Sequence, residues 1–116
     1  LNELFERVED YLNEEGEWTK EWYVGWSNCN NHVSNILRKH YKRPYFLPDE
    51  SERSKLDWIF MGTPKYGADI HIDDVNNPSW QAQISGIKYW LFKPPAECLL
   101  KCPSSLSVSV YPGDII

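Results

Sequence analysis

The chain has 116 residues, 41% of them hydrophobic, with six tryptophans and seven tyrosines, which is enough apolar material for one domain. Its net charge is −5 and its Lys and Arg residues are scattered, so it has no continuous basic surface that would indicate nucleic-acid binding. It has no apolar run of about 18 residues, and no transmembrane helix is predicted.

The first part of the sequence predicts two helices with a strand between them. Apolar residues recur at spacings of three and four from Leu1 to Leu12, which predicts a helix that stops near Gly16. Dense aromatic residues then predict a strand over about 21–24. The second helix is expected to have its cap near Asn31. Its buried residues should be Val33, Ile36 and Leu37.

The segment after this helix predicts a surface connection followed by strands. Two prolines and a charged run occupy 44–55, which is typical of a connection. From Leu56 onward, short apolar runs alternate with turn residues, as in an all-β sandwich or barrel. The expected strands are "LDWIFMG", "ADIHI", "WQAQI", "IKYWLF", "ECLLK", "SLSVSV" and "DII". We therefore expect one domain, in which a helical and linker region (1–55) packs on a β region (56–116).

The end of the chain and the cysteines lead to two further expectations. "YPGDII" contains a turn and a strand that stops as it starts, so the fold is expected to be truncated before its last strands. An odd cysteine count argues against a complete disulfide framework. Cys98 and Cys102 either pair across a tight turn or are two small buried residues. Cys29, with the two histidines of the predicted helix, has no standard zinc spacing.

The stretch "GADIHIDD" carries the candidate chemistry. In a strand, side chains two residues apart point to the same face, roughly 6.5–7 Å apart, so His71 and Asp73 would converge on one metal ion. Ile70 and Ile72 would then face a core. Two histidines with one carboxylate are typical of non-haem Fe(II) oxygenases. A His-x-Asp pair alone is a common accident, so its context decides its meaning.

Lys88 supplies that context. Ser85-Gly86 predicts a tight hairpin turn, and on the returning strand Lys88 shares a face with Trp90 and Phe92. A lysine on an apolar face must reach solvent or meet an anion, because an unpaired buried ammonium is costly. The distal carboxylate of 2-oxoglutarate is an anion that belongs beside a ferrous site.

Taken together, the motifs resemble the core of the jumonji-C (JmjC) 2-oxoglutarate oxygenases. They are most similar to the phosphatidylserine-receptor-like subgroup of lysyl hydroxylases and arginine demethylases. The resemblance runs from about Tyr23 to Ile116 and is densest in "WIFMGTPKYGADIHIDDVNNPSWQAQISGIKYWLFKPP". The matching residues are Met61, Gly62, Pro64, Gly67, His71, Ile72, Asp73, Trp80, Gly86, Lys88, Trp90, Phe92 and Pro94.

The resemblance implies a double-stranded β-helix (cupin or jelly-roll type) with His71 and Asp73 as catalytic metal ligands for Fe(II). It implies that Lys88 binds 2-oxoglutarate, with Gln81 at a polar pocket position, and that a third ligand, a histidine, follows Ile116. Ala68 departs from the family, which usually has Thr or Ser there to help bind the cosubstrate. The substrate would be a protein or peptide, and the acidic composition is compatible with a basic peptide.

Two other interpretations remain open at this level. A non-catalytic cupin-like binding module, derived from such an enzyme, is mildly favoured by Ala68. A plain β-rich domain would use His71 and Asp73 as a polar pair. The sequence alone does not identify the substrate, the compartment or the oligomeric state.

Overall fold

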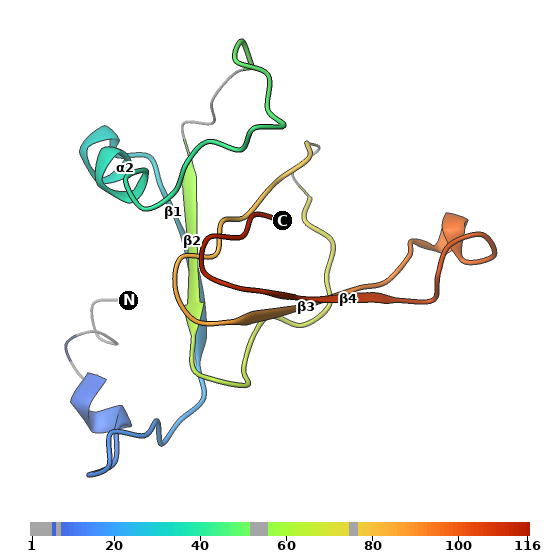
Figure 1. Ribbon diagram of the computed structural model, residues 1–116. Helices are drawn as coiled ribbons and strands as arrows, with labels where there is room; N and C mark the ends of the chain where they lie inside the picture. The colour runs from blue at the N-terminus through green and yellow to red at the C-terminus, as the bar shows by residue number, and fades with distance from the viewer. Residues whose placement is uncertain (1–5, 7, 52–55, 75–76) are drawn as a thin grey trace. The chain divides into compact units, whose positions relative to one another are not determined.

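The computed structural model describes residues 6, 8–51, 56–74 and 77–116. Its contacts divide the chain into two compact units, Leu1–Cys29 with Lys55–His71, and Asn30–Ser54 with Ile72–Ile116. Among the described residues, each unit holds an antiparallel sheet of two strands (Figure 1). The elements in chain order are the 3-10 helix η1 (Val8–Tyr11), β1 (Tyr23–Asn28), α2 (Asn31–Leu37), β2 (Asp57–Gly62), β3 (Lys88–Phe92), the 3-10 helix η2 (Ala96–Cys98) and β4 (Leu106–Val110).

Strands β1 and β2 form the sheet of the first unit. Alternation along the two strands places Tyr23, Trp58 and Phe60 on one face. The Phe60 ring stacks between the other two, with centroid distances of 6.3 Å to Tyr23 and 5.9 Å to Trp58. Phe60 lies opposite Gly25, and a β-carbon at residue 25 would approach this ring to 2.6 Å. Glycine at this position therefore lets the ring lie against the neighbouring strand.

Thr63 and Trp22 extend the pairing of β1 and β2 by one residue beyond Tyr23 and Gly62. Thr63 is only 3% exposed, and its hydroxyl accepts a hydrogen bond of 3.1 Å from the backbone N–H of Trp22. The Thr63 N–H donates in return to the Trp22 carbonyl at 3.0 Å. Trp18 packs edge-on against Trp22, with 5.2 Å between the ring centroids. The backbone polar groups of Trp22 and Thr63 are thus paired at the start of β1, beside the two tryptophan rings, whereas the buried indole N–H of Trp22 has no hydrogen-bond partner in the described part of the chain.

The N-terminal helix expected up to Leu12 is only partly observed. Residues 1–5 and 7 lie outside the described residues, and the remainder contains η1, a single 3-10 turn. After it, the Asn13 side chain accepts hydrogen bonds from the backbone N–H groups of Glu15 and Glu17. Asparagine offers the backbone this local alternative to helical bonding. The chain reverses at Gly16, which has a φ of +78°, close to the predicted stop.

Helix α2 is confirmed with its cap next to Asn31, but its buried face differs from the prediction. The cap is Asn30, whose side chain accepts from the N–H groups of His32 and Val33. The predicted buried residues Val33 and Ile36 are 39% and 46% exposed, whereas Ser34 is 3% exposed. With only seven residues, the helix buries one narrow stripe, and in this fold that stripe is centred on the serine.

Strands β3 and β4 form the hairpin of the second unit, with Lys88 opposite Val110. The pairing continues beyond the strands, because Gln81 and Ile116 exchange backbone hydrogen bonds of 2.8 and 3.0 Å. Residues 81–92 and 106–116 therefore run side by side as one long ribbon. It is interrupted where Gly86 and Gly113 adopt positive φ values of +71° and +98°. In Figure 1, η2 lies at the far end of this ribbon.

The loop at the end of the ribbon contains the disulfide. Cys98 and Cys102 are bonded, with their Cα atoms 5.5 Å apart, so the pairing alternative is the one observed. The N–H of Cys102 donates to the carbonyl of Cys98 at 2.8 Å, which closes one helical turn. Cys29 is a free, exposed thiol. The prediction of a strand over "ECLLK" is wrong. The backbone N–H groups of Lys101 and Cys102 donate to the Cys98 carbonyl in this turn, instead of to a neighbouring strand.

Three other predicted strands are not strands in the described residues. The stretch "ADIHI" has no strand assignment, and "WQAQI" and "DII" contribute only the bridge between Ala82 and Ile115. An apolar alternation produces a strand only when a neighbouring strand exchanges hydrogen bonds with it. Ser85-Gly86 therefore does not join two paired strands. It bends the chain between the bridge and β3, whose partner is β4.

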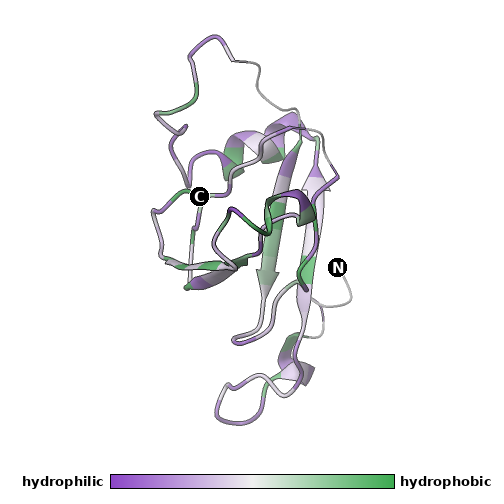
Figure 2. Ribbon diagram, turned by 90° about the vertical axis from the view of Figure 1, so that its right-hand side faces the viewer, coloured by the Kyte–Doolittle hydropathy of each residue, from purple (hydrophilic) through white to green (hydrophobic). Residues whose placement is uncertain are grey.

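The fold is β-rich, with small antiparallel sheets and little helix in the described residues. Val110 is buried, at 4% exposure, while many large apolar side chains along the strands remain accessible. Hydrophobic segments lie along the strands of each sheet (Figure 2). Within the described ranges, no helix combines the length and apolarity needed to cross a bilayer. The β-rich expectation is thus confirmed at the level of class.

Candidate functional site

The segment that carries His71 and Asp73 is an exposed, extended connection. Both residues are exposed, and no strand is assigned over 67–74. Ile70 and Ile72, which were expected to face a core, are 58% and 88% exposed. The expected strand face does not form here, because the described residues supply no partner strand. His71 ends the first compact unit, and Asp73 belongs to the second.

His71 has a defined ring orientation within its own unit. Its Nδ1 lies 2.6 Å from the backbone carbonyl oxygen of Asp69. Because a carbonyl only accepts, Nδ1 must carry the proton in this contact, and the neutral ring then has its lone pair on Nε2. Histidines that bind metals commonly donate their second ring N–H to a carbonyl or carboxylate in this way. The local geometry therefore suits His71 for ligation through Nε2.

Asp73 offers an exposed carboxylate two residues after His71. Nitrogen and oxygen donors of this kind suit Fe(II) and other first-row metals. The described residues contain no group of three or more His, Cys, Asp or Glu side chains arranged to hold a metal. Cys29, His32 and His40 are exposed residues.

Lys88 and Gln81 are brought together by the ribbon of the second unit. The Lys88 ammonium donates a hydrogen bond of 3.1 Å to Gln81 Oε1. The same ammonium lies 4.5 Å from the centroid of the Trp90 ring, within the range of a cation–π interaction. Both side chains are half-buried. Thus the two residues assigned to cofactor binding are neighbours, although seven positions separate them in the chain.

The position of Lys88 follows from the strand register. Residues two apart share a face, so Lys88, Trp90 and Phe92 form a row, and the rings of Trp90 and Phe92 stack at 5.6 Å. Across the pair, Lys88 lies opposite the buried Val110. This apolar surrounding removes water from the ammonium, and the resulting desolvation lowers the pKa of Lys88 from its usual value of 10.5. The predicted lysine on an apolar face is confirmed.

Trp90 is the site residue whose direct contact the sequence analysis did not name. The signal was its place two residues after Lys88 on one strand, which puts a ring beside the ammonium. A second aromatic contact involves Trp80, the residue before Gln81 in the chain. Tyr41 packs edge-on against Trp80 at 5.5 Å. This contact joins the segment around Gln81 to the part of the unit that contains α2.

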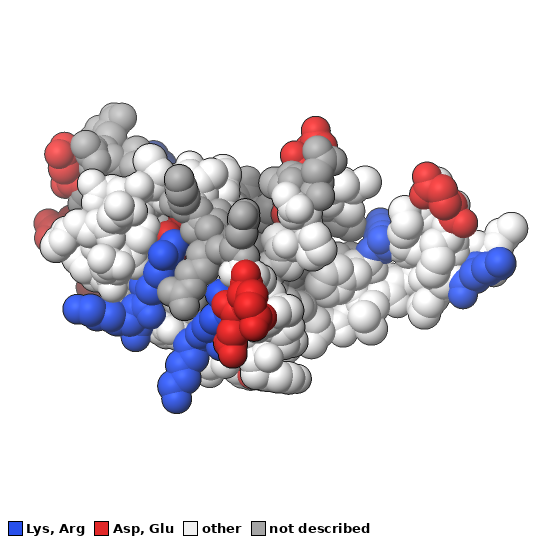
Figure 3. Space-filling model, turned by 90° about the horizontal axis from the view of Figure 1, so that it is seen from above, with Lys and Arg blue, Asp and Glu red and all other residues white. Residues whose placement is uncertain are grey.

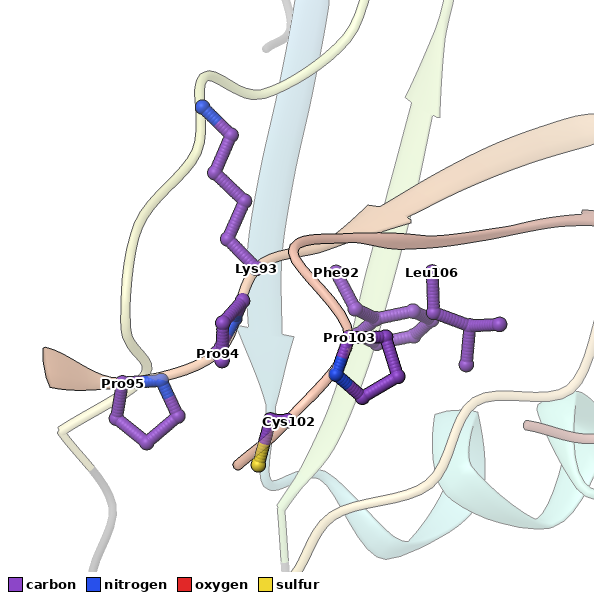
Figure 4. Close-up of a pocket in the computed structure, with 7 residues that line it drawn as sticks. All are labelled: Phe92, Lys93, Pro94, Pro95, Cys102, Pro103 and Leu106. Carbon is purple, nitrogen blue, oxygen red and sulfur yellow. The ribbon is translucent and has the colours of Figure 1, made fainter. Parts of the chain in front are cut away.

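A separate apolar pocket of about 230 Å³ lies at the end of the β3–β4 hairpin. Figure 4 shows Phe92 and Leu106, which are cross-strand partners, beside Pro103, with the Lys93 side chain extending away from them. Its lining contains no carboxylate or imidazole. The pocket has an apolar lining without a group suited to acid–base or metal chemistry.

The charged side chains do not form a surface of one sign on the face shown in Figure 3. Figure 3 shows Lys and Arg side chains beside Asp and Glu side chains on the face in view. Their interspersion agrees with a chain of 12 basic and 17 acidic residues. Recognition of a charged partner must therefore come from local groups rather than from a large uniform field.

Comparison with known proteins identifies relatives for about half of the chain. Over 66 residues, the chain is 32% identical to a bifunctional arginine demethylase and lysyl-hydroxylase of Caenorhabditis briggsae, with 51% of this chain and 17% of the relative covered. An arginine-specific demethylase of Arabidopsis thaliana is 30% identical over 66 residues, with 52% and 13% covered. The Caenorhabditis elegans bifunctional enzyme is 34% identical, with 51% and 16% covered.

No family model matches the chain, and no solved structure matches it. The matched region spans about one sixth of the length of the curated relatives. Each of these relatives is named for demethylation of arginine or hydroxylation of lysine. The similarities therefore support a relationship between this chain and the JmjC-type demethylases and hydroxylases that its motifs resemble.

Proposed function

We propose that the chain forms the iron- and 2-oxoglutarate-binding part of an oxygenase, a hydroxylase or demethylase that acts on a protein side chain. The single observation that carries this proposal is the arrangement around Lys88. A half-buried ammonium, held by Gln81 and Trp90 on a sheet face, is prepared to receive an anion. The names of the relatives supply the reaction class.

The residues around Lys88 fit the distal carboxylate of 2-oxoglutarate. An ammonium that has lost water recovers electrostatic stabilisation when a carboxylate reaches it. Gln81 already accepts one of its three donor hydrogens, and the amide NH2 of Gln81 is a further donor suited to a carboxylate oxygen. Binding of the carboxylate should therefore raise the pKa of Lys88 and fix one end of the cosubstrate.

The residues of the exposed segment fit two of the three positions around Fe(II). His71 would bind through Nε2, with its Nδ1–H oriented by the Asp69 carbonyl, and Asp73 would bind through its carboxylate. Iron bound together with 2-oxoglutarate would activate O2, which is the oxidant for hydroxylation, while 2-oxoglutarate supplies two of the electrons. The proposal includes a histidine beyond Ile116 as the third ligand. It also includes a double-stranded β-helix, with 56–116 as its N-terminal part and 1–55 packing on it.

One observation favours a second candidate, a non-catalytic binding module. Ala68 stands where the resemblance leads us to expect a hydroxyl, and its exposed methyl side chain has no group to donate to a carboxylate. In this candidate, the ribbon would still bind an anion at Lys88. The metal ligands at His71 and Asp73 would have no catalytic role.

The two candidates are distinguished by anaerobic titration of the full-length protein with Fe(II) and 2-oxoglutarate. The oxygenase should develop the weak visible charge-transfer band of the ternary complex, and His71→Ala should abolish it. Lys88→Ala should weaken 2-oxoglutarate far more than iron, while Lys93→Ala, an exposed lysine on the same hairpin, should change neither. A band that survives His71→Ala would refute the metal assignment. Equal losses of both ligands in Lys88→Ala would refute the role of Lys88.

A further inference from the structure

Two tight turns of the second unit border a pocket of about 330 Å³. This volume is near the lower end for small-molecule sites. None of its lining residues belongs to the site around Lys88 or to the segment of His71 and Asp73. The lining residues are Pro44, Tyr45, Phe46, Gly113, Asp114 and Ile115.

The first turn presents two aromatic rings at nearly right angles. The N–H of Leu47 donates to the carbonyl of the buried Pro44 at 3.2 Å, so Tyr45 and Phe46 are the two central residues of the turn. Their ring centroids are 5.7 Å apart and their planes meet at 77°. Tyr45 is 98% exposed and Phe46 is 52% exposed. Two ring surfaces are thus held by a short turn and remain accessible to a ligand.

The second turn presents a carboxylate with a fixed orientation. Gly113 has a φ of +98°, and the N–H of Asp114 donates to the carbonyl of Tyr111 at 2.9 Å. In return, Asp114 Oδ2 accepts from the N–H of Tyr111 at 2.8 Å. A carboxylate has about four acceptor positions, so this bond orients the group without exhausting it.

The combination of rings and a carboxylate selects the charge of the ligand. Aromatic faces attract cations through the ring quadrupole, and a carboxylate does so through its charge. A neutral apolar ligand would cover the rings but would also remove water from Asp114 without compensation. The Arg43 guanidinium, which precedes the first turn, is not part of the lining, and its Nη2 donates to the Pro48 carbonyl and the Ser51 hydroxyl.

We propose that this pocket of Tyr45, Phe46 and Asp114 binds the cationic tip of a basic peptide side chain, an alkylated ammonium or a guanidinium. The binding needs neither iron nor 2-oxoglutarate, so the proposal does not rest on the oxygenase chemistry. An aromatic pair completed by a carboxylate is a known type of recognition site for such groups. The charge that selects a cation here is the local carboxylate of Asp114.

The test uses the full-length protein in EDTA, without 2-oxoglutarate. Tetramethylammonium is titrated while the backbone amide signals of Tyr45 and Asp114 are followed by NMR, and neopentyl alcohol serves as the neutral probe of similar shape. We expect saturable shifts for the cation at millimolar concentration and at least fivefold weaker binding of the alcohol. Equal binding of the two probes, or no saturable shift with the cation, would overturn the proposal.

Three variants and one control locate the effect. Tyr45→Leu and Phe46→Leu should each weaken the cation roughly two- to fivefold, the size of an exposed cation–π interaction. Asp114→Asn keeps an oxygen to accept from Tyr111, and should weaken the cation while reducing the salt dependence of binding. Tyr89→Leu removes an aromatic ring of 66% exposure outside the pocket and should have no effect.

The variants also separate a binding role from a structural one. Tyr45 is almost fully exposed, so its replacement leaves the fold intact and keeps the test valid if Phe46→Leu unfolds the turn. A peptide carrying trimethyllysine should bind at least as tightly as the free ion. Weaker binding of the peptide would exclude a side chain as the ligand. Unchanged affinity in both Tyr45→Leu and Asp114→Asn would refute the site.

Discussion

Replacement of Lys88 by methionine should separate the role of its charge from the role of its side-chain stem. Methionine retains an unbranched apolar chain that packs against Trp90, while the ammonium is lost. The lost interactions are the hydrogen bond to Gln81, about 0.5–1.5 kcal/mol, and the cation–π contact, about 0.5–1 kcal/mol. Relief of the desolvation of the charge acts in the opposite direction. The free energy of unfolding at pH 7 should therefore change by no more than about 1 kcal/mol.

The effect of the same change on an anionic ligand should be much larger. A hydrogen bond to a charged group contributes about 1.5–3 kcal/mol, so loss of the ammonium should weaken 2-oxoglutarate about 10- to 150-fold. Isothermal titration of the full-length protein measures the affinity, and urea unfolding measures the stability. Lys93→Met, an exposed lysine five residues later, is the matched control. If Lys88→Met stays folded and its affinity for 2-oxoglutarate falls less than threefold, the ammonium does not bind the cosubstrate.

The pH dependence of stability provides a second readout for Lys88. Burial lowers the pKa of Lys88 in the folded protein below the unfolded value of 10.5. Between these two pKa values the unfolded chain binds more protons, so the contribution of Lys88 to the free energy of unfolding rises with pH across that window. The free energy of unfolding of the wild type minus that of Lys88→Met should therefore increase as the pH rises toward 10.5. A constant difference would show that the ammonium is not desolvated.

Three further predictions concern the local structure. Gly25→Ala places a β-carbon 2.6 Å from the Phe60 ring, so we expect a loss of about 1–3 kcal/mol in urea unfolding; no loss would show that the ring moves aside freely. The Cys98–Cys102 disulfide closes a loop of only five residues, so its reduction should lower the free energy of unfolding by at most about 2 kcal/mol, measured with and without reductant. Asn30→Ala removes the acceptor at the start of α2 and should cost about 1 kcal/mol, seen as faster amide exchange in this helix.

The candidate site could be predicted from the sequence where it depends on a short strand. The row of Lys88, Trp90 and Phe92 follows from the period of two in a strand, and the structure confirms it in β3. The proximity of Gln81 to Lys88 was expected only from the family resemblance. In the structure it arises because the ribbon continues past Gly86, and this bend depends on the pairing of residues 81–83 with the end of the chain.

The segment around His71 shows why the rest could not be predicted. The alternation of Ile70 and Ile72 is typical of a strand, but alternation describes the two faces of a strand without supplying its partner. In the described residues no strand pairs with this segment, and both isoleucines are exposed. The same limit applies to Val33 and Ile36 in α2, whose buried face is set by what packs against the helix.

The sequence by itself determined the local features of this protein: β2, β3 and β4, the helix α2 with an asparagine cap, and the chemical types at positions 71, 73 and 88. These follow from the preferences of neighbouring residues, which act over a few positions. Only the tertiary structure decided which segments pair, and with them the Lys88–Gln81 contact and the pocket between the turns at Tyr45 and Asp114. Such contacts join residues far apart in the chain, and they form because distant backbone groups and apolar surfaces must satisfy one another.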